Sequence, residues 1–433
     1  MSEFLGRQVV VEVNQKLPST VTCREALVLG DKVFCQRCGS HFVKEIAELP
    51  NGDIYCPFCI AFGRLTSRHL LASEEEQTEA RDIQFTWSGT LTNFQQKIAD
   101  VLIKNFQKNK HSLIWAVTGS GKTEMIFPII AEVLKKGGRV GVTSPRIDVC
   151  REIYPRISQV FPNEKALLLY GASEERYRYS KLTVCTTHQL FHFYQAFDLL
   201  IVDEIDAFPY EGDPLLRFAV RQALKQIGNY IYLTATPSQN LLKEIKTFSI
   251  EKLPLRFHQR PLIVPELIWY ESWKQCFVST RKIRKLVRYL NILMKDNAVL
   301  VFCPSIVFMK KVYVKLSSFF TTDELTCVSA QDEQREEKVQ NMREKKYRIL
   351  LSTTILERGV TFENVSVIIL GANHPVFSKS ALVQIAGRVD RKGDFNRGRV
   401  LFFFNQQTPA IRQALKEIKE MNHLAQRWLN NEL

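Results

Sequence analysis

Apolar runs alternate with helix-like stretches from about residue 85 to residue 250. Apolar runs lie at residues 112–117, 182–185, 199–202 and 230–233, and a strand-like run lies at 140–143. Because these runs lack polar alternation, they predict strands that are buried on both faces. One helix is expected from Lys122, ending where two lysines precede a glycine at 135–137. The pattern predicts an α/β domain with a parallel sheet covered by helices.

A second alternation of the same kind follows a proline-containing stretch at residues 253–265. Its expected strands lie at 299–302, 349–351, 365–370 and 400–404. The chain therefore has two α/β domains after an N-terminal region with few periodic elements. We predict a small module at 1–80, a first domain at 81–250, a linker at 251–275 and a second domain at 276–433.

The composition indicates which class of ligand the protein binds. The chain has 433 residues and a net charge of +14, which favours an anionic polymer as ligand. Charge alone does not separate DNA, RNA and an acidic membrane surface. No apolar run reaches the ~18 residues of a membrane span, and the N-terminus lacks a signal-peptide pattern. We expect a soluble cytosolic protein, with the inner face of the membrane as an alternative location.

Four of the ten cysteines are closely spaced in the N-terminal region. They form two Cys-x-x-Cys pairs, which are Cys35 with Cys38 and Cys56 with Cys59. Four thiolates at this spacing suit one tetrahedral Zn²⁺, and a complete set of four implies a structural site. Two redox pairs or unligated thiols are the alternative, and His41 is a possible substitute ligand. Small zinc modules often present basic and aromatic side chains to nucleic acid, although such aromatics also form miniature cores. The candidates here are Arg37, His41, Phe42, Lys44, Tyr55 and Phe58.

A glycine-rich loop follows the first apolar run. Residues 116–123 read AVTGSGKT, with a strand expected before them and a helix after them. Backbone N–H groups of such a loop surround phosphate oxygens, and the helix N-terminus adds its dipole. Lys122 would reach the β and γ phosphates of ATP, and the Thr123 hydroxyl would bind Mg²⁺. The other expected nucleotide contacts in the loop are Thr118, Gly119, Ser120 and Gly121. Ala116 replaces the first glycine of the strict pattern.

Two acidic residues follow the run at 199–202. We assign Asp203 to Mg²⁺ and Glu204 to the orientation of the attacking water. Adjacent acids after a strand are often only a polar loop. Their distance from the phosphate loop favours the catalytic interpretation.

With these residues in place, the chain resembles the superfamily-two helicases. The resemblance rests on ordered motifs at 91–95, 144–146, 186–187, 234–237, 302–305, 352–354, 358–359 and 384–391. It implies that the motifs at 144–146 and 186–187, the second including Thr187, touch the nucleic-acid backbone, and that the motif at 234–237 couples hydrolysis to motion. It implies two tandem RecA-like domains and a nucleic-acid-dependent ATPase. It also implies that Gln95 reads adenine, that Gly359 belongs to a nucleotide-site motif, that Gln384 is a catalytic residue of the final motif, and that Arg388 and Arg391 of that motif contact the γ-phosphate.

The cysteine module before a compact core narrows the resemblance to the ComFA family of late competence proteins. The family implies an ATP-driven motor on single-stranded DNA that helps to take up transforming DNA. It also implies ComFC, DprA and the membrane DNA channel as partners. The core is similar to the replication-restart helicase PriA, whose cysteines lie within the core. An RNA helicase and a non-motor nucleic-acid adaptor remain alternatives. The five basic residues of 281–288 would track phosphates or form a solvated helix face.

Overall fold

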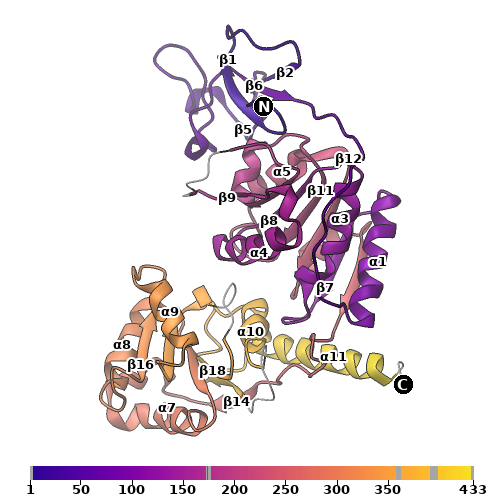
Figure 1. The fold of residues 1–433 in the computed structure, drawn as a ribbon. Helices are drawn as coiled ribbons and strands as arrows, with labels where there is room; N and C mark the ends of the chain where they lie inside the picture. The colour runs from indigo at the N-terminus through magenta and orange to yellow at the C-terminus, as the bar shows by residue number, and fades with distance from the viewer. Residues whose placement is uncertain (1–2, 172, 174–176, 357–361, 391–397, 431–433) are drawn as a thin grey trace. The chain divides into compact units, whose positions relative to one another are not determined.

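The computed structural model describes residues 3–171, 173, 177–356, 362–390 and 398–430 (Figure 1). Its contacts divide the chain into two compact units. The first contains Met1–Trp115 and Lys122–Glu251, and the second contains Ala116–Gly121 and Lys252–Leu433. Within the described ranges, no helix is both long and apolar enough to span a membrane.

The first unit is built around a seven-stranded sheet. Its strands lie in the order β13 (Ser249–Leu253), β7 (Ser112–Ala116), β12 (Leu224–Thr234), β11 (Phe197–Asp203), β8 (Val140–Ser144), β10 (Leu182–Thr186) and β9 (Leu167–Leu169). The pairs from β7 to β9 are parallel. Parallel strands align their carboxyl ends, so the residues that follow β7, β8, β10, β11 and β12 share one edge of the sheet.

Helices connect these strands, as expected for parallel pairs. They are α1 (Asn93–Gln107), α2 (Lys122–Met125), α3 (Phe127–Lys135), α4 (Ile147–Val160), α5 (Pro214–Ala223) and α6 (Gln239–Glu244), with the short 3₁₀ segments η3 (Pro162–Glu164) and η4 (Thr187–His192). The helix expected from Lys122 is divided into α2 and α3 at Ile126, and Pro128 lies in the first turn of α3. Its end is as predicted, because Lys136 caps α3 and Gly137 has a φ of +78°.

Two small antiparallel sheets make up the N-terminal module. One has the order β1 (Gln8–Glu12), β6 (His69–Glu74) and β2 (Val21–Glu25). The other joins β3 (Leu27–Val28), β4 (Val33–Cys35) and β5 (His41–Phe42). Two 3₁₀ segments follow, η1 (Lys44–Ile46) and η2 (Ile60–Phe62). The module shares one apolar core with the large sheet, because its cysteines belong to the same buried cluster as Phe191, Phe197 and Leu216.

A six-stranded sheet forms the centre of the second unit. Its order is β14 (Glu266–Trp269), β19 (Val400–Phe404), β18 (Val365–Leu370), β15 (Ala298–Phe302), β17 (Ile349–Ser352) and β16 (Leu325–Val328), and all pairs are parallel. The other elements are η5 (Trp273–Val278), α7 (Thr280–Leu293), α8 (Ile306–Leu316), α9 (Arg335–Arg343), η6 (Thr354–Leu356), α10 (Lys379–Ala386) and α11 (Pro409–Asn430).

The predicted fold class is confirmed: two parallel-sheet α/β domains and a four-cysteine cluster are present. Each predicted run at 299–302, 349–351, 365–370 and 400–404 lies within a strand. In the two large parallel sheets the sequence pattern missed four strands, which are β9, β13, β14 and β16, and it predicted none of the short strands β1 to β6 of the module. All four end a sheet and two contain exposed positions, so they lack a long apolar signature. The domain boundaries proposed from the sequence stay predictions.

Candidate nucleotide, nucleic-acid and metal sites

The glycine-rich loop has the backbone that phosphate binding requires. β7 ends at Ala116 and α2 begins at Lys122, so a strand enters the loop and a helix leaves it. Gly119 and Gly121 have φ values of +79° and +75°, in the left-handed region that side chains disfavour. Ser120 is buried. The loop therefore turns its backbone as a phosphate cradle does, and the residues fit ATP.

Thr123, the expected Mg²⁺ ligand, has a basic neighbour. Its hydroxyl accepts a hydrogen bond from Arg156 Nη1 at 3.3 Å, and Arg156 also forms an ion pair with Glu124. A guanidinium beside a hydroxyl opposes cation binding there. For Thr123 to hold Mg²⁺, the Arg156 side chain has to turn away.

The acidic pair stands at the carboxyl end of β11. Asp203 is the last residue of the strand and is 8% exposed, and its Oδ1 accepts the Glu204 backbone N–H at 2.8 Å. Glu204 has a φ of +53°, an uncommon conformation for a non-glycine residue. This turn directs the chain from the strand into the loop that carries Asp206.

Asp206 joins two strand ends of the first sheet. Its two carboxylate oxygens accept hydrogen bonds from the hydroxyls of Thr234 and Thr236, both at 2.6 Å. All three side chains are buried. Charge-assisted bonds of this length are strong in a buried setting, so the loop after β11 and the loop after β12 are held together.

Other residues singled out from the sequence occupy structural positions. Gln95 is 2% exposed, and its Oε1 accepts the Thr92 N–H at 2.8 Å in a capping box of α1. Thr187 begins η4 and is fully buried, and its hydroxyl has no hydrogen-bond partner among the described residues. The roles expected for Gln95 in adenine recognition and for Thr187 at the nucleic-acid backbone stay predictions.

Candidate residues of the second unit lie around α10. Gln384 is in this helix and Arg388 follows it, and both are buried. Arg256 braces the segment after α10, because its guanidinium donates to the carbonyl oxygens of Val389 and Asp390 at 2.8 and 2.6 Å. Sequence reasoning missed Arg256, which lies in the predicted linker.

Some assigned residues cannot be placed. Gly359 and Arg391 lie outside the described residues, as does Arg358 of the motif at 358–359.

The four cysteines of the module meet at one point. Their sulfurs all lie within 4.8 Å of one another, with Cys35 and Cys59 at 3.8 Å and Cys38 and Cys56 at 3.7 Å. A tetrahedron with Zn–S bonds of about 2.3 Å has edges of about 3.8 Å, so the geometry fits zinc. All four residues are buried.

Crowding drives the thiol pKa values apart: the contact with Cys38 raises the pKa of Cys35, whereas the contact with Cys35 lowers the pKa of Cys56. A divalent cation relieves this conflict, because it favours the thiolate form of every ligand.

Arg37 lies against the metal site and not on the module surface. It is 2% exposed and donates from Nη2 to Cys59 Sγ at 3.0 Å and from Nε to the same sulfur at 3.3 Å. Phe42 is also buried, whereas Phe58 is 51% exposed. The suggestion that Arg37 and Phe42 face nucleic acid is therefore wrong, because both side chains are part of the module's interior.

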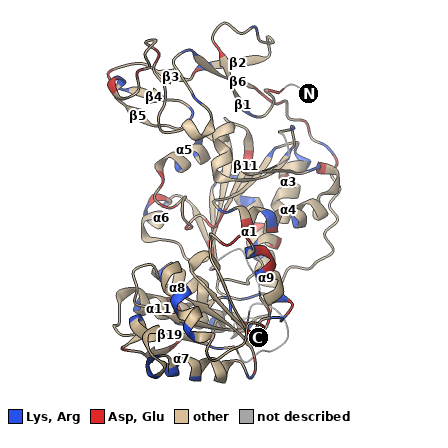
Figure 2. Cartoon of the chain, turned by 90° about the vertical axis from the view of Figure 1, so that its left-hand side faces the viewer, with Lys and Arg blue, Asp and Glu red and all other residues tan. Residues whose placement is uncertain are grey.

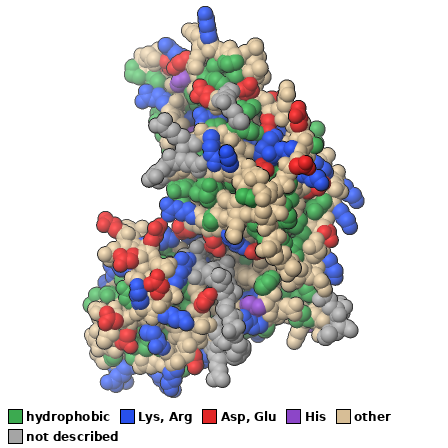
Figure 3. Space-filling model, in the orientation of Figure 1, with side chains coloured by type: hydrophobic (Ala, Val, Ile, Leu, Met, Phe, Trp, Pro, Cys, Tyr) green, Lys and Arg blue, Asp and Glu red, His purple; other side chains and the backbone are tan. Residues whose placement is uncertain are grey.

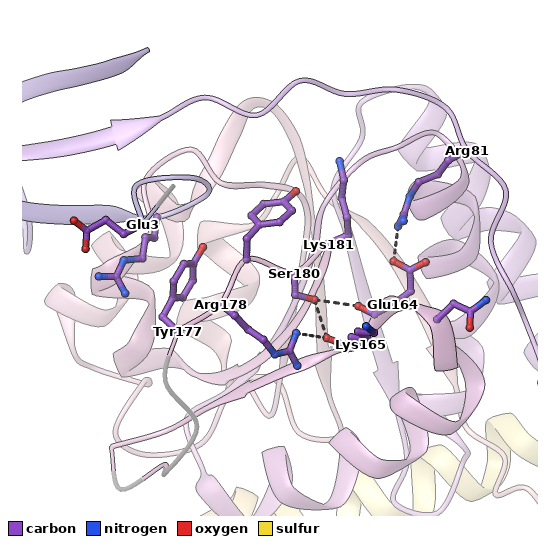
Figure 4. Close-up of a pocket in the computed structure, with 11 residues that line it drawn as sticks. Glu3, Arg81, Glu164, Lys165, Tyr177, Arg178, Ser180 and Lys181 are labelled. Carbon is purple, nitrogen blue, oxygen red and sulfur yellow. Dashed lines mark hydrogen bonds and ion pairs between the residues drawn. The ribbon is translucent and has the colours of Figure 1, made fainter. Parts of the chain in front are cut away.

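A pocket of 840 Å³ lies where the N-terminal segment meets the first sheet (Figure 4). Its charged groups are largely paired within the described residues. Arg81 forms an ion pair with Glu164, and Arg178 donates to the Ala166 carbonyl at 2.7 Å. Lys181 pairs with Glu76, outside the lining. These pairs fasten the N-terminal segment to the sheet and leave few groups for a ligand.

Positive charge is concentrated in the second part of the sequence. Residues 251–433 contain 30 lysines and arginines against 18 aspartates and glutamates. In α7 four basic residues fall within 281–285, and the first turn contains no acidic residue (Figure 2). Blue side chains also gather over α7 in the space-filling view (Figure 3). Because a helix N-terminus favours anions, this arrangement suits phosphate groups.

Comparison with known proteins places these features in a family. Residues 88–239 match the family described as Type III restriction enzyme, res subunit, and residues 281–393 match the Helicase conserved C-terminal domain. The chain is 43% identical to Competence protein ComFA of Streptococcus pneumoniae over 394 residues, covering 90% of each protein. It is 37% identical to Competence protein ComFA of Bacillus subtilis, covering 94% of this chain and 89% of that protein. The chain belongs to the ComFA family.

Solved structures agree on the fold. Mss116p bound to ssRNA and AMP-PNP has a TM-score of 0.57 at 18% identity, covering 77% of each chain. The matched helicase domains and the ComFA relatives make this chain a superfamily-two helicase, a nucleic-acid-dependent ATPase and a helicase-family motor in competence. Its helicase domains imply ATP and Mg²⁺ as cofactors.

Proposed function

We propose that this protein is an ATP-driven translocase on single-stranded DNA that pulls transforming DNA into the cytosol. The observation that carries the proposal is the clamp of Asp206 on Thr234 and Thr236, beside the acidic pair. It joins the loop expected to orient water to the loop expected to couple hydrolysis to motion. ATP turnover and polymer movement are linked through these hydrogen bonds.

Within this function, Lys122 and the loop backbone bind the phosphates, and Asp203 with Thr123 holds Mg²⁺. Glu204 orients water, and Arg388 supplies positive charge at the γ-phosphate. The polymer is gripped through its backbone, and the basic face of α7 suits that role. Zn²⁺ occupies the four-cysteine site and stabilises the module.

ComFC, DprA and the membrane DNA channel are the proposed partners, and the inner face of the membrane is the proposed place of work. Support for these partners comes from the family alone. A replication-restart type of DNA helicase, an RNA helicase and a non-motor adaptor are the competing functions.

The deciding experiment compares activators of ATP hydrolysis. Full-length protein is assayed with single-stranded DNA, duplex DNA and single-stranded RNA of equal length and salt. We expect single-stranded DNA to stimulate turnover most. Equal or greater stimulation by RNA would support an RNA helicase, and no stimulation by any polymer would support an adaptor.

A further inference from the structure

The 59–63 turn of the cysteine module is held by one arginine. Besides its two bonds to the Cys59 sulfur, Arg37 donates to the carbonyl oxygens of Cys59, Phe62 and Gly63 at 2.8, 3.0 and 2.6 Å. The planar guanidinium reaches all of these acceptors at once, which a lysine amine cannot do. Arg37 therefore fixes the turn that carries Phe62.

The same residue is anchored to the first sheet's helices. The Arg37 carbonyl accepts a hydrogen bond from Gln222 Nε2 of α5 at 2.9 Å. Close by, Gly39 has a φ of +74°, and a Cβ there would lie 2.4 Å from the ring of Phe218. Only glycine permits this approach of the first cysteine pair to α5.

Phe62 extends the contact to η4. Its ring centroid lies 4.7 Å from that of Phe191 and 6.1 Å from that of His192. Burial lowers the pKa of His192 to about 4, so this contact is made by a neutral imidazole at pH 7. η4 starts with Thr187, whose buried hydroxyl lacks a partner among the described residues. A buried hydroxyl in this position remains available for a hydrogen bond if this end of η4 shifts.

Charge makes the arrangement depend on the metal. A buried guanidinium needs an anion, because an uncompensated charge in a protein interior is strongly destabilising. Four thiolates around one Zn²⁺ carry a net charge of about −2 and meet that need. Without the metal the four sulfurs are no longer held together at fixed positions, so Arg37 loses the fixed sulfur acceptor that holds it against Cys59.

We propose that Arg37 is a positioning residue that couples zinc loading of the four-cysteine site to the conformation of η4. Zinc holds Arg37, Arg37 holds the 59–63 turn, and Phe62 holds η4. The consequence for nucleic-acid-stimulated hydrolysis rests on the proposed function, since it requires Thr187 to meet the polymer. The coupling itself does not require a polymer.

The test is hydrogen exchange of the full-length protein without nucleic acid, before and after zinc removal by a chelator under reducing conditions. We expect exchange in residues 187–192 to rise about fivefold or more on zinc removal, while α11 of the second unit changes little. Unchanged exchange in η4 would overturn the proposal. Because this comparison uses the wild-type chain, it tests the coupling even if the variants fold poorly.

Variants separate the two steps of the proposed coupling, which are the contact of Arg37 with the zinc site and the contact of Phe62 with η4. Arg37→Gln should release zinc to a chromogenic chelator about 10–100-fold faster than wild type. Arg37→Lys keeps a cation near Cys59 and should slow that release again, but η4 should still exchange fast because the carbonyl contacts are gone. Phe62→Ala should release zinc at the wild-type rate and still raise exchange in η4.

Arg64→Gln is the matched control, because Arg64 is an exposed arginine of the same module. If Arg37→Gln and Arg64→Gln release zinc equally slowly, the proposal is wrong. Turnover with single-stranded DNA is measured on the same proteins. If exchange in η4 is faster but stimulation by single-stranded DNA stays at the wild-type level, the coupling is supported. The same result would count against contact between Thr187 and the polymer.

Discussion

Several side chains that are expected to bind ATP or Mg²⁺ also make structural contacts within the protein. Gln95 is buried in the capping box of its own helix, and Thr123 is contacted by Arg156. Lys122 is the first residue of α2, directly after Gly121 of the phosphate loop. Its position makes it the residue that tests the phosphate-loop assignment most directly.

Lys122→Ala should lower the turnover of ATP by about 100-fold or more, since it removes a cation from the developing phosphate charge. Binding of single-stranded DNA should change little, because other residues grip the polymer. Steady-state hydrolysis and oligonucleotide binding check this, with the exposed Lys110→Ala as control. Normal hydrolysis in Lys122→Ala would rule out the phosphate-loop assignment.

Arg388→Ala should reduce turnover by roughly 10³-fold or more with a modest change in ATP affinity, as for other arginines that stabilise transition-state charge. Measurement of kcat and of nucleotide binding separates the two effects. Arg412→Ala, an exposed position of α11, is the control. Wild-type kcat in Arg388→Ala would exclude Arg388 from the reaction.

Elements of the first unit are connected by short polar links between strand ends. The most direct is the bond of Asp206 to the loop after β12, where Thr234 and Thr236 each donate at 2.6 Å. Hydrogen bonds to a charged group contribute about 1.5–3 kcal/mol, which is enough to keep two loops moving together. A link of this kind transmits motion without any large apolar contact.

Thr236→Val keeps the side-chain shape and removes one of the two donors to Asp206. We expect DNA-stimulated turnover to fall about tenfold while ATP binding stays near wild type, because only the link between loops is weakened. Thr247→Val, an exposed threonine of the same unit, should leave both unchanged. A loss of ATP binding equal to the loss of turnover would show that Thr236 acts on nucleotide and not on coupling.

His192 makes the packing contact between η4 and the cysteine module sensitive to acid pH. Burial, with smaller effects from Arg7 and Arg37, lowers its pKa from 6.5 to about 4. Between these values the unfolded state binds a proton that the folded state excludes, so stability is present above about pH 6.5 and is lost as pH falls toward 4.

His192→Gln should therefore lose less stability than wild type between pH 7 and pH 5, by up to about 2 kcal/mol. Urea midpoints at both pH values measure this, and carboxylate effects cancel in the comparison. Parallel pH dependence in the two proteins would mean that His192 is not held neutral.

The molecule as a whole divides its charge unevenly, with most of the excess of basic residues in 251–433. A sequence-independent grip on phosphates should weaken steeply with salt. For a single strand, log affinity should fall by about 0.7 per phosphate neutralised for each unit of log salt.

Arg284→Gln with Arg288→Gln on α7 should reduce that slope by about 1.4, whereas Lys416→Gln on α11 should not change it. Binding titrations from about 50 to 300 mM salt with two unrelated oligonucleotides provide the data. An unchanged slope in the α7 variant would mean that the basic side chains of α7 do not contact phosphates and form a solvated helix face.

Local patterns were enough to predict the parallel sheets and the cysteine tetrad, and they indicated a glycine-rich loop after a strand and an acidic pair at a strand end. Apolar runs, positive-φ glycines and Cys-x-x-Cys turns depend on neighbours in the sequence, so they are visible in it. The burial of Arg37 and Thr187, the pairing of Asp206 with Thr236 and the shared core of module and sheet were not predictable in this way. Those features depend on contacts between segments up to 185 residues apart, and only packing decides which polar side chain is enclosed and which partner it meets.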